Sequence, residues 1–206
     1  MRDADNIRRI EDIAVHSSLT SARSALFLMG FIFCPHSPRC VTRHPDYLPT
    51  KCKRVGVFVD ESIECIKRTA EEYALDYIQL HGHESPKYCT LLHDYHIIKT
   101  INISTGRDFT ETSAYEGLID FFLFDTKAHC AGGTGMKFDW TLTKVYTGTT
   151  PFLLSGGIGI EDAPRIRDFR HPCCVGIDVN SRFELAPGYK DPDALRLFLN
   201  NINSQQ

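Results

Sequence analysis

Short apolar runs alternate with amphipathic stretches along most of this chain. Seven of the runs are almost continuously apolar and rich in β-branched and aromatic residues, a pattern typical of parallel strands that are covered on both faces. We therefore predict strands at Leu26–Phe33, Arg54–Val59, Tyr77–His81, His96–Ile101, Phe121–Asp125, Pro151–Ser155 and Val175–Val179.

The stretches between these runs carry apolar residues at helical spacing. Between Ser62 and Ala74, for example, Ile63, Ile66 and Ala70 fall on one stripe of a helix. Serine or aspartate followed by proline is a typical helix start, because the first side chain caps the helix and proline fits its first turn. We predict helices at about Asp3–Ile13, at Ser62–Ala74, from Ser85-Pro86, at Ile160–Phe169 and from Asp191-Pro192.

Alternation of strands and helices predicts βαβ units and a parallel sheet, within a single domain spanning residues 1–206. Right-handed crossovers leave an open doubly wound sheet or a closed (β/α)₈ TIM barrel. Polar or glycine residues end several different strands, which favours the barrel, because an open sheet gathers such residues at one switch point. A complete barrel needs eight strands, and this chain opens on a helix, so we expect the first strand to be missing. The residues at strand ends are Asp60, His81, Asp125, Gly156-Gly157 and Asp178.

Composition narrows the possible partners. The net charge of −3 gives no general attraction to nucleic acid or to an acidic membrane, and no apolar run reaches the length of a membrane span. No apolar leader follows the first residues, and the 8 cysteines form no CxxC pair, so we expect a cytoplasmic protein with reduced thiols. The 9 histidines show no metal-ligand spacing, and we predict no metal site.

Two glycine-containing loops predict a phosphate site. Gly156 and Gly157 follow one strand, and Asn180 and Ser181 follow the next. Glycine lets backbone N–H groups approach an anion, and barrels commonly hold phosphate after their last two strands. Either loop alone is equally well explained as a tight turn, but the two together favour phosphate.

Three other strand ends carry candidate chemistry. Asp125 ends a run of four apolar residues, so it should be partly desolvated and suited to general-acid work, although a solvated or capping carboxylate fits as well. Arg39 lies in a proline-pinned loop, where it is either a carboxylate-binding group or a solvated arginine. Gln79 and His81 share one strand face, as ligand contacts or as polar core residues.

These pieces together resemble the phosphoribosylanthranilate isomerase family, in an order and spacing that extend from the start of the chain to its last helix. The matching stretches are Gly30-Phe-Ile-Phe-Cys-Pro-His-Ser-Pro-Arg39, Arg54-Val-Gly-Val-Phe-Val59, Gln79-Leu-His-Gly82, Phe124-Asp-Thr126, Gly132-Gly-Thr-Gly135, Phe138-Asp-Trp140, Ser155-Gly-Gly157, Gly176-Ile-Asp-Val-Asn-Ser-Arg-Phe-Glu184, Pro187-Gly188 and Lys190-Asp191.

The resemblance implies a cofactor-free Amadori rearrangement in tryptophan biosynthesis. N-(5′-phosphoribosyl)anthranilate would become 1-(o-carboxyphenylamino)-1-deoxyribulose 5-phosphate. By resemblance, Asp125 is the general acid, Arg39 lies near the anthranilate, His81 lines the pocket and Asp178 is a polar residue at the last strand end. The phosphate loops of the family match Gly156, Gly157, Asn180 and Ser181.

The chain departs from the family at its start. The family's general base is a cysteine in a Lys-x-Cys-Gly sequence that closes the first strand, and residues like Met1-Arg-Asp-Ala-Asp5 often follow it. We expect that strand and that base to be absent, leaving an impaired enzyme whose open barrel edges allow a monomer or a homodimer. Cys34 is a weak substitute base. The alternatives are a non-catalytic barrel that binds a phosphorylated metabolite, and another phosphate-binding isomerase or epimerase.

Overall fold

The computed structural model describes residues 1–17, 26–126 and 139–203. Its main sheet has 7 parallel strands that follow one another in chain order. All the predicted strands are confirmed, with ends that differ from the prediction by no more than two residues. They are β1 (Leu28–Ile32), β2 (Lys53–Phe58), β3 (Tyr77–Leu80), β4 (His96–Ile103), β5 (Phe121–Thr126), β6 (Phe152–Leu154) and β7 (Cys174–Ile177).

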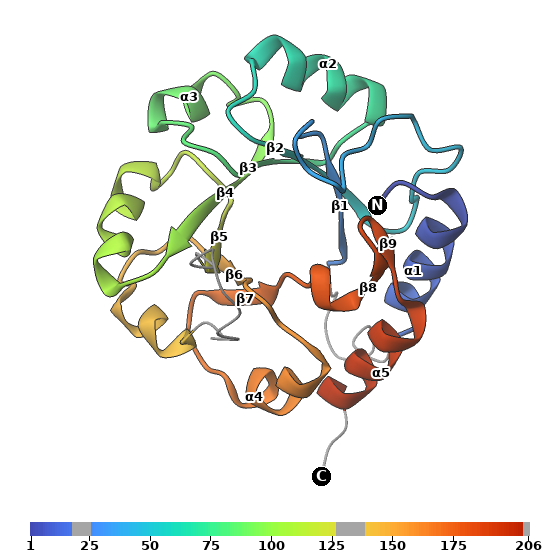
Figure 1. Cartoon of the computed structure of the whole chain (residues 1–206). Helices are drawn as coiled ribbons and strands as arrows, with labels where there is room; N and C mark the ends of the chain where they lie inside the picture. The colour runs from blue at the N-terminus through green and yellow to red at the C-terminus, as the bar shows by residue number, and fades with distance from the viewer. Residues whose placement is uncertain (18–25, 127–138, 204–206) are drawn as a thin grey trace.

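The strands curl into a ring, and the helices lie outside it (Figure 1). This is the predicted (β/α) barrel with seven strands, and β1 and β7 are the two edge strands of the sheet in the described part of the chain. The α-helices are α1 (Ala4–His16), α2 (Ile63–Tyr73), α3 (Pro86–Thr90), α4 (Ala163–Asp168) and α5 (Pro192–Asn203), and the 3₁₀ helices are η2 (Gly106–Tyr115), η3 (Trp140–Val145), η4 (Ile160–Asp162) and η5 (Ser181–Phe183).

The predicted helix starts have the expected caps. The side chains of Asp3, Ser62 and Ser85 each accept a hydrogen bond from a backbone N–H in the first turn of α1, α2 and α3. The apolar stripe of α2 buries Ile66 and Ala70 against the sheet. Local sequence therefore determines where each of these helices begins and which face it buries.

The core has an outer and an inner part. Between the sheet and the helices, large side chains such as Phe58, Phe122 and Phe152 are completely buried. Inside the ring, Val55, Ile98 and Leu123 form a small separate cluster. Because strand side chains alternate between the two faces, the residues that follow this inner cluster toward the strand ends also face the interior.

Two features differ from the predicted elements. The segment predicted as a helix at Ile160–Phe169 is split into η4 and α4, with Asp162 between them accepting a hydrogen bond from the N–H of Gly159. A short antiparallel hairpin, formed by β8 (Glu184–Ala186) and β9 (Tyr189–Lys190), was not predicted. Its turn contains Gly188, whose φ of 79° favours glycine. None of the described helices has the length and apolar character needed to cross a membrane.

Candidate active site

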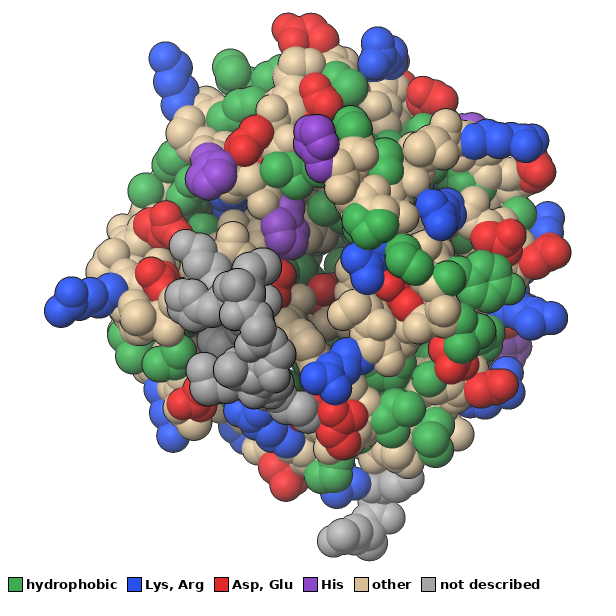
Figure 2. All heavy atoms as spheres, in the orientation of Figure 1, with side chains coloured by type: hydrophobic (Ala, Val, Ile, Leu, Met, Phe, Trp, Pro, Cys, Tyr) green, Lys and Arg blue, Asp and Glu red, His purple; other side chains and the backbone are tan. Residues whose placement is uncertain are grey.

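The carboxyl ends of the parallel strands meet at one rim of the ring. The strand register pairs Leu80 with Lys99 and Asn102 with Asp125, so the residues that end β3, β4 and β5 are neighbours. The face of the ring seen in Figure 2 is hollowed near its centre, and histidine, acidic and basic side chains lie around the hollow. In a (β/α) barrel this is the rim at which active sites are built.

His81 is held in one orientation by its neighbours. The Gln79 amide nitrogen lies 3.2 Å from His81 Nδ1 and 3.2 Å from the Thr100 hydroxyl, which is itself 3.3 Å from the same ring nitrogen. With the amide nitrogen of Gln79 as the donor, Nδ1 is the acceptor in this contact, and Nε2 is the ring nitrogen that faces away from Gln79. That Nε2 lies 3.8 Å from Asp125 Oδ2. Thr100 was not predicted from the sequence, because threonine in a strand has no distinctive signal.

Asp125 and His81 are both partly shielded from water, with side chains 24% and 32% exposed. The expectation of partial desolvation for Asp125 is therefore confirmed. His83, which a continued strand would place on the same face as His81, instead donates to Asp60 and is exposed. It turns away because β3 ends at Leu80.

A buried ion pair supports the loop that carries His81. Lys99 Nζ lies 2.8 Å from Glu84 Oε2 and 2.7 Å from the carbonyl oxygen of Gly82. The Glu84 carboxylate also accepts from the N–H groups of Gly82 and Asp60. Residue 82 must be glycine, because a Cβ there would lie 2.7 Å from the backbone nitrogen of Asp60. These contacts hold the loops after β2 and β3 against the middle of β4.

The two predicted phosphate loops lie side by side. Gly156 and Gly157 follow β6 with φ angles of 94° and 67°, a conformation that favours glycine. The backbone N–H of Asp178 donates to the carbonyl of Leu154 at 2.7 Å, and the Ser155 hydroxyl donates to the Asp178 carboxylate at 2.8 Å. The loops after β6 and β7 therefore open onto the same part of the rim.

Arg39 reaches the rim from the loop after β1, but it is already paired. Its Nε and Nη2 lie 2.8 and 2.7 Å from Glu184 Oε2. On the other side of this carboxylate, Oε1 accepts from Lys190 Nζ at 3.3 Å, and Lys190 donates to Asn180 Oδ1 at 2.6 Å. Burial alone would raise the pKa of Glu184, but the Arg39 hydrogen bond and the charge of Lys190 outweigh it and hold the pKa below its usual value.

The contacts of Glu184 and Lys190 were missed at the sequence level. Both residues lie in stretches that resemble the family, on either side of Pro187-Gly188, and a proline-glycine dipeptide is a recognised turn signal. Reading that signal would have predicted that Glu184 and Lys190 face each other across a hairpin. It would not have predicted the contact with Arg39, which is 145 residues away in sequence.

The positions of the other predicted residues add little to the geometry of the site. Ser181 begins η5 and is exposed, and Cys34 is half-buried in the turn that follows β1. The Gly132–Gly135 loop lies outside the described residues. Within residues 1–17, 26–126 and 139–203, no group of three histidine, cysteine or acidic side chains could hold a metal ion.

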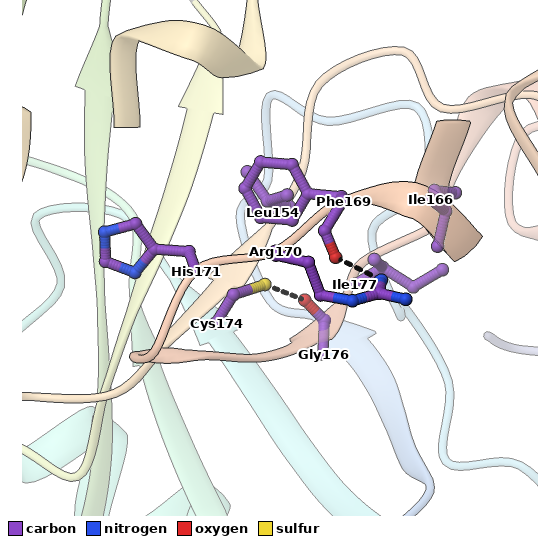
Figure 3. A pocket seen from close by; sticks show the side chains of 8 residues that line it. All are labelled: Leu154, Ile166, Phe169, Arg170, His171, Cys174, Gly176 and Ile177. Carbon is purple, nitrogen blue, oxygen red and sulfur yellow. Dashed lines mark hydrogen bonds between the residues drawn. The ribbon is translucent and has the colours of Figure 1, made fainter. Parts of the chain in front are cut away.

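One mainly apolar cavity of about 260 Å³ is lined by none of the predicted site residues (Figure 3). It is formed by the last residues of α4, the loop after it and strands β6 and β7, and it includes Leu154, Phe169 and Cys174. The Cys174 thiol donates to the carbonyl of Gly176, and burial raises the pKa of this thiol to about 11. A thiol of this kind is unreactive at neutral pH.

The ring of parallel strands, with polar side chains at the carboxyl ends of the strands, places this protein in the class of (β/α)-barrel enzymes. The sequence profile of N-(5'phosphoribosyl)anthranilate (PRA) isomerase matches residues 5–201. The chain belongs to this family. Proteins named N-(5'-phosphoribosyl)anthranilate isomerase from Parabacteroides distasonis and Phocaeicola vulgatus are 45% and 42% identical to it, over 98% and 100% of this chain and 90% and 96% of theirs.

Solved structures give the same result. A crystal structure of phosphoribosyl anthranilate isomerase in complex with reduced 1-(o-carboxyphenylamino)-1-deoxyribulose 5-phosphate has a TM-score of 0.73 and 31% identity, with coverage of 98% of this chain and 96% of that one. The isomerase from Thermus thermophilus has a TM-score of 0.70 and 26% identity, with coverage of 98% of both chains. The predicted family and barrel class are thus confirmed.

Proposed function

We propose that this chain recognises N-(5′-phosphoribosyl)anthranilate and carries the isomerase machinery of tryptophan biosynthesis, in the cytoplasm and without a cofactor. Membership of the isomerase family is the observation that carries this proposal. The arrangement of the rim supports it: a carboxyl group, an arginine, the glycine-containing loop after β6 and the loop after β7 lie at the same end of the barrel. These are the groups that an acid-catalysed reaction of a carboxylated, phosphorylated substrate requires.

In the proposed reaction, Asp125 acts as general acid and protonates the ribose ring oxygen, which opens the ring to a Schiff base. A base then removes the proton on C2′, and the resulting enolamine tautomerises to the ketone. His81 presents its Nε2–H toward Asp125, so it stabilises the carboxylate that forms when Asp125 gives up its proton. The separation of 3.8 Å is one that a bound substrate would tighten.

Substrate binding is assigned to the two sides of the rim. Arg39 takes the anthranilate carboxylate, using the guanidinium edge that Glu184 leaves open. The backbone N–H groups near Gly156, Gly157 and Ser181 take the phosphate, with Asn180 beside them. Asp178 and Gln79 orient the sugar between these two ends.

The remaining group that the proposed reaction needs is the general base. Lys-x-Cys-Gly, the sequence that holds the family's cysteine base, does not occur in residues 1–206. We therefore expect the chain as written to bind substrate but to turn it over poorly. Cys34 remains the weak candidate for a substitute base.

Fluorescence of the anthranilate group in freshly made substrate provides the test of turnover. The chain as written should be nearly inactive, and an N-terminal extension ending in Lys-x-Cys-Gly should restore the reaction. In that extended chain, Asp125→Asn should abolish turnover while still binding the reduced product analogue. Turnover by the unextended chain that is lost in Cys34→Ser would instead identify Cys34 as the base.

A second candidate function is binding without turnover, which is favoured by the same rim residues when the base is missing. Analogue affinity without isomerisation in either the chain or its extended form would favour it. In the described part of the chain β1 and β7 are the edge strands of the sheet, which supports a proposal of monomer or homodimer, because an edge strand can pair with another chain. Gel filtration combined with light scattering distinguishes these two states.

A further inference from the structure

Glu184 makes contacts that the proposed reaction does not use. Its carboxylate is 4% exposed and lies between two cations, Arg39 on Oε2 and Lys190 on Oε1. The N–H of Gly188 also donates to Oε1 at 3.1 Å. Each oxygen of this buried carboxylate therefore serves a different group, and no simple uncharged side chain of the same shape could satisfy both sets of donors.

The groups on its two sides belong to opposite edges of the sheet. Arg39 follows β1 and Asn180 follows β7, and these two strands are not neighbours in the sheet order. Lys190 completes the link, because its Nζ donates to both the backbone oxygen and the side-chain oxygen of Asn180, at 3.0 and 2.6 Å. Figure 1 shows the β8–β9 hairpin, which carries Glu184 and Lys190, between β7 and β1.

The hairpin is itself anchored. The side-chain oxygen of Asn6 accepts from the N–H of Lys190, and the side-chain nitrogen of Asn6 donates to the carbonyl of Lys190, both at 2.8 Å. Asn6 is completely buried in α1. The Lys190 backbone is thus held as a strand residue would be, so its side chain has a fixed origin from which to reach Asn180 and Glu184.

We infer that Glu184 is a positioning residue that couples the two substrate-binding ends, by orienting Arg39 for the anthranilate carboxylate and, through Lys190, holding Asn180 in the phosphate loop. This inference rests on the proposed function, which assigns those two ends. The coupling follows from geometry: a guanidinium held on one edge by a fixed carboxylate loses fewer rotamers when its open edge binds a ligand. Loss of the Glu184 charge should loosen Arg39 and the phosphate loop together.

Calorimetry with two probes tests the coupling. The probes are the reduced product analogue 1-(o-carboxyphenylamino)-1-deoxyribulose 5-phosphate, which spans both ends, and inorganic phosphate, which occupies one end. The variants are Glu184→Gln, Glu184→Asp and Arg39→Met, together with the control Glu71→Gln, which removes one exposed carboxylate from α2. Circular dichroism at the assay temperature confirms that each variant is folded.

Glu184→Gln should weaken analogue binding about ten-fold, as expected for the loss of a charge-assisted hydrogen bond, and should also weaken phosphate binding. Arg39→Met should weaken the analogue but leave phosphate unchanged. In the Arg39→Met background, Glu184→Gln should cost less than it does alone. Glu184→Asp keeps the charge on a shorter side chain and should recover part of the loss, and Glu71→Gln should match the unaltered chain.

Analogue and phosphate binding at the unaltered level in Glu184→Gln would overturn the inference. Weaker analogue binding with normal phosphate binding would also overturn it, because Glu184 would then act on Arg39 alone. If the unaltered chain binds phosphate but not the analogue, the proposed function itself fails. These outcomes separate an error in the coupling from an error in the substrate.

Discussion

Replacing Lys99 with methionine is expected to destabilise the protein strongly, because it leaves Glu84 as a buried charge without its partner. Both side chains are almost fully buried, at 3% and 1% exposed. Methionine has nearly the same length and fills the same space, so the change removes the ammonium group rather than the packing. It also removes the hydrogen bond from Lys99 Nζ to the carbonyl oxygen of Gly82.

The structure sets the size of the effect. Removing one partner from a buried ion pair costs about 3–5 kcal/mol. The Glu84 carboxylate keeps its hydrogen bonds from the N–H groups of Asp60 and Gly82, so the lower end of that range, about 3 kcal/mol, is the appropriate figure. For a domain of this size, that loss lowers the unfolding midpoint by about 6–12 °C.

Urea denaturation, followed by circular dichroism, measures the free energy of unfolding. The double variant Lys99→Met with Glu84→Gln should recover much of the loss, because a neutral amide oxygen still accepts from both N–H groups without carrying a buried charge. The control is Lys53→Met, which removes the exposed partner of Asp76 and should leave the unfolding midpoint unchanged within error. A loss below about 1 kcal/mol for Lys99→Met, or a double variant less stable than the single one, would refute the reasoning.

Three further predictions each concern a single residue. If the Gln79 amide donates to His81 Nδ1, Gln79→Leu should lower the population of the Nε2–H tautomer, which nitrogen NMR of the imidazole ring measures; an unchanged population would mean that Gln79 does not set the tautomer. Gly157→Ala should cost about 1 kcal/mol in urea denaturation, because φ is +67° while an added Cβ meets no atom within 4 Å, and a much larger loss would reveal a steric cause instead. Burial would raise the pKa of Glu11, but hydrogen bonds from Tyr47 and three backbone N–H groups hold it below its usual value, so its contribution to stability is present above about pH 4.3 and is lost as pH falls through the folded-state pKa. Glu11→Gln should therefore flatten that part of the acid-denaturation curve, and an unchanged slope would contradict the assignment.

The sheet could be predicted from the sequence because its strands are continuously apolar. Runs such as Phe121–Phe124 are short and rich in aromatic residues, which favours a strand buried on both faces over a longer buried helix. Strand ends were less well predicted, because a residue such as Val59 has strand propensity but lies beyond the end of β2. The β8–β9 hairpin was missed because its strands are too short for any alternation to be visible.

The residues of the candidate site also differ in how well the sequence predicts their neighbours. Residues that end strands, such as His81 and Asp125, are brought together by the register of neighbouring strands, so their proximity follows once the barrel is predicted. The partner of Arg39 depends instead on a hairpin folding back across the rim. Sequence reasoning predicted an arginine open to a substrate carboxylate, but the structure places Glu184 on one of its edges. No local pattern contains that information.

Two kinds of contact connect the strands around the rim, backbone hydrogen bonds and side-chain contacts, and they differ in their sensitivity to mutation. Neighbouring strands from β1 to β7 are joined by backbone hydrogen bonds, which substitutions other than proline leave in place. Between β1 and β7, in the described part of the chain, the link at the rim passes through the side chains of Arg39, Glu184, Lys190 and Asn180. A charge change among these four side chains should leave the strand ladders intact while it alters the spacing of the two proposed substrate-binding ends. Its effect should therefore appear in ligand affinity at temperatures where the fold is still complete.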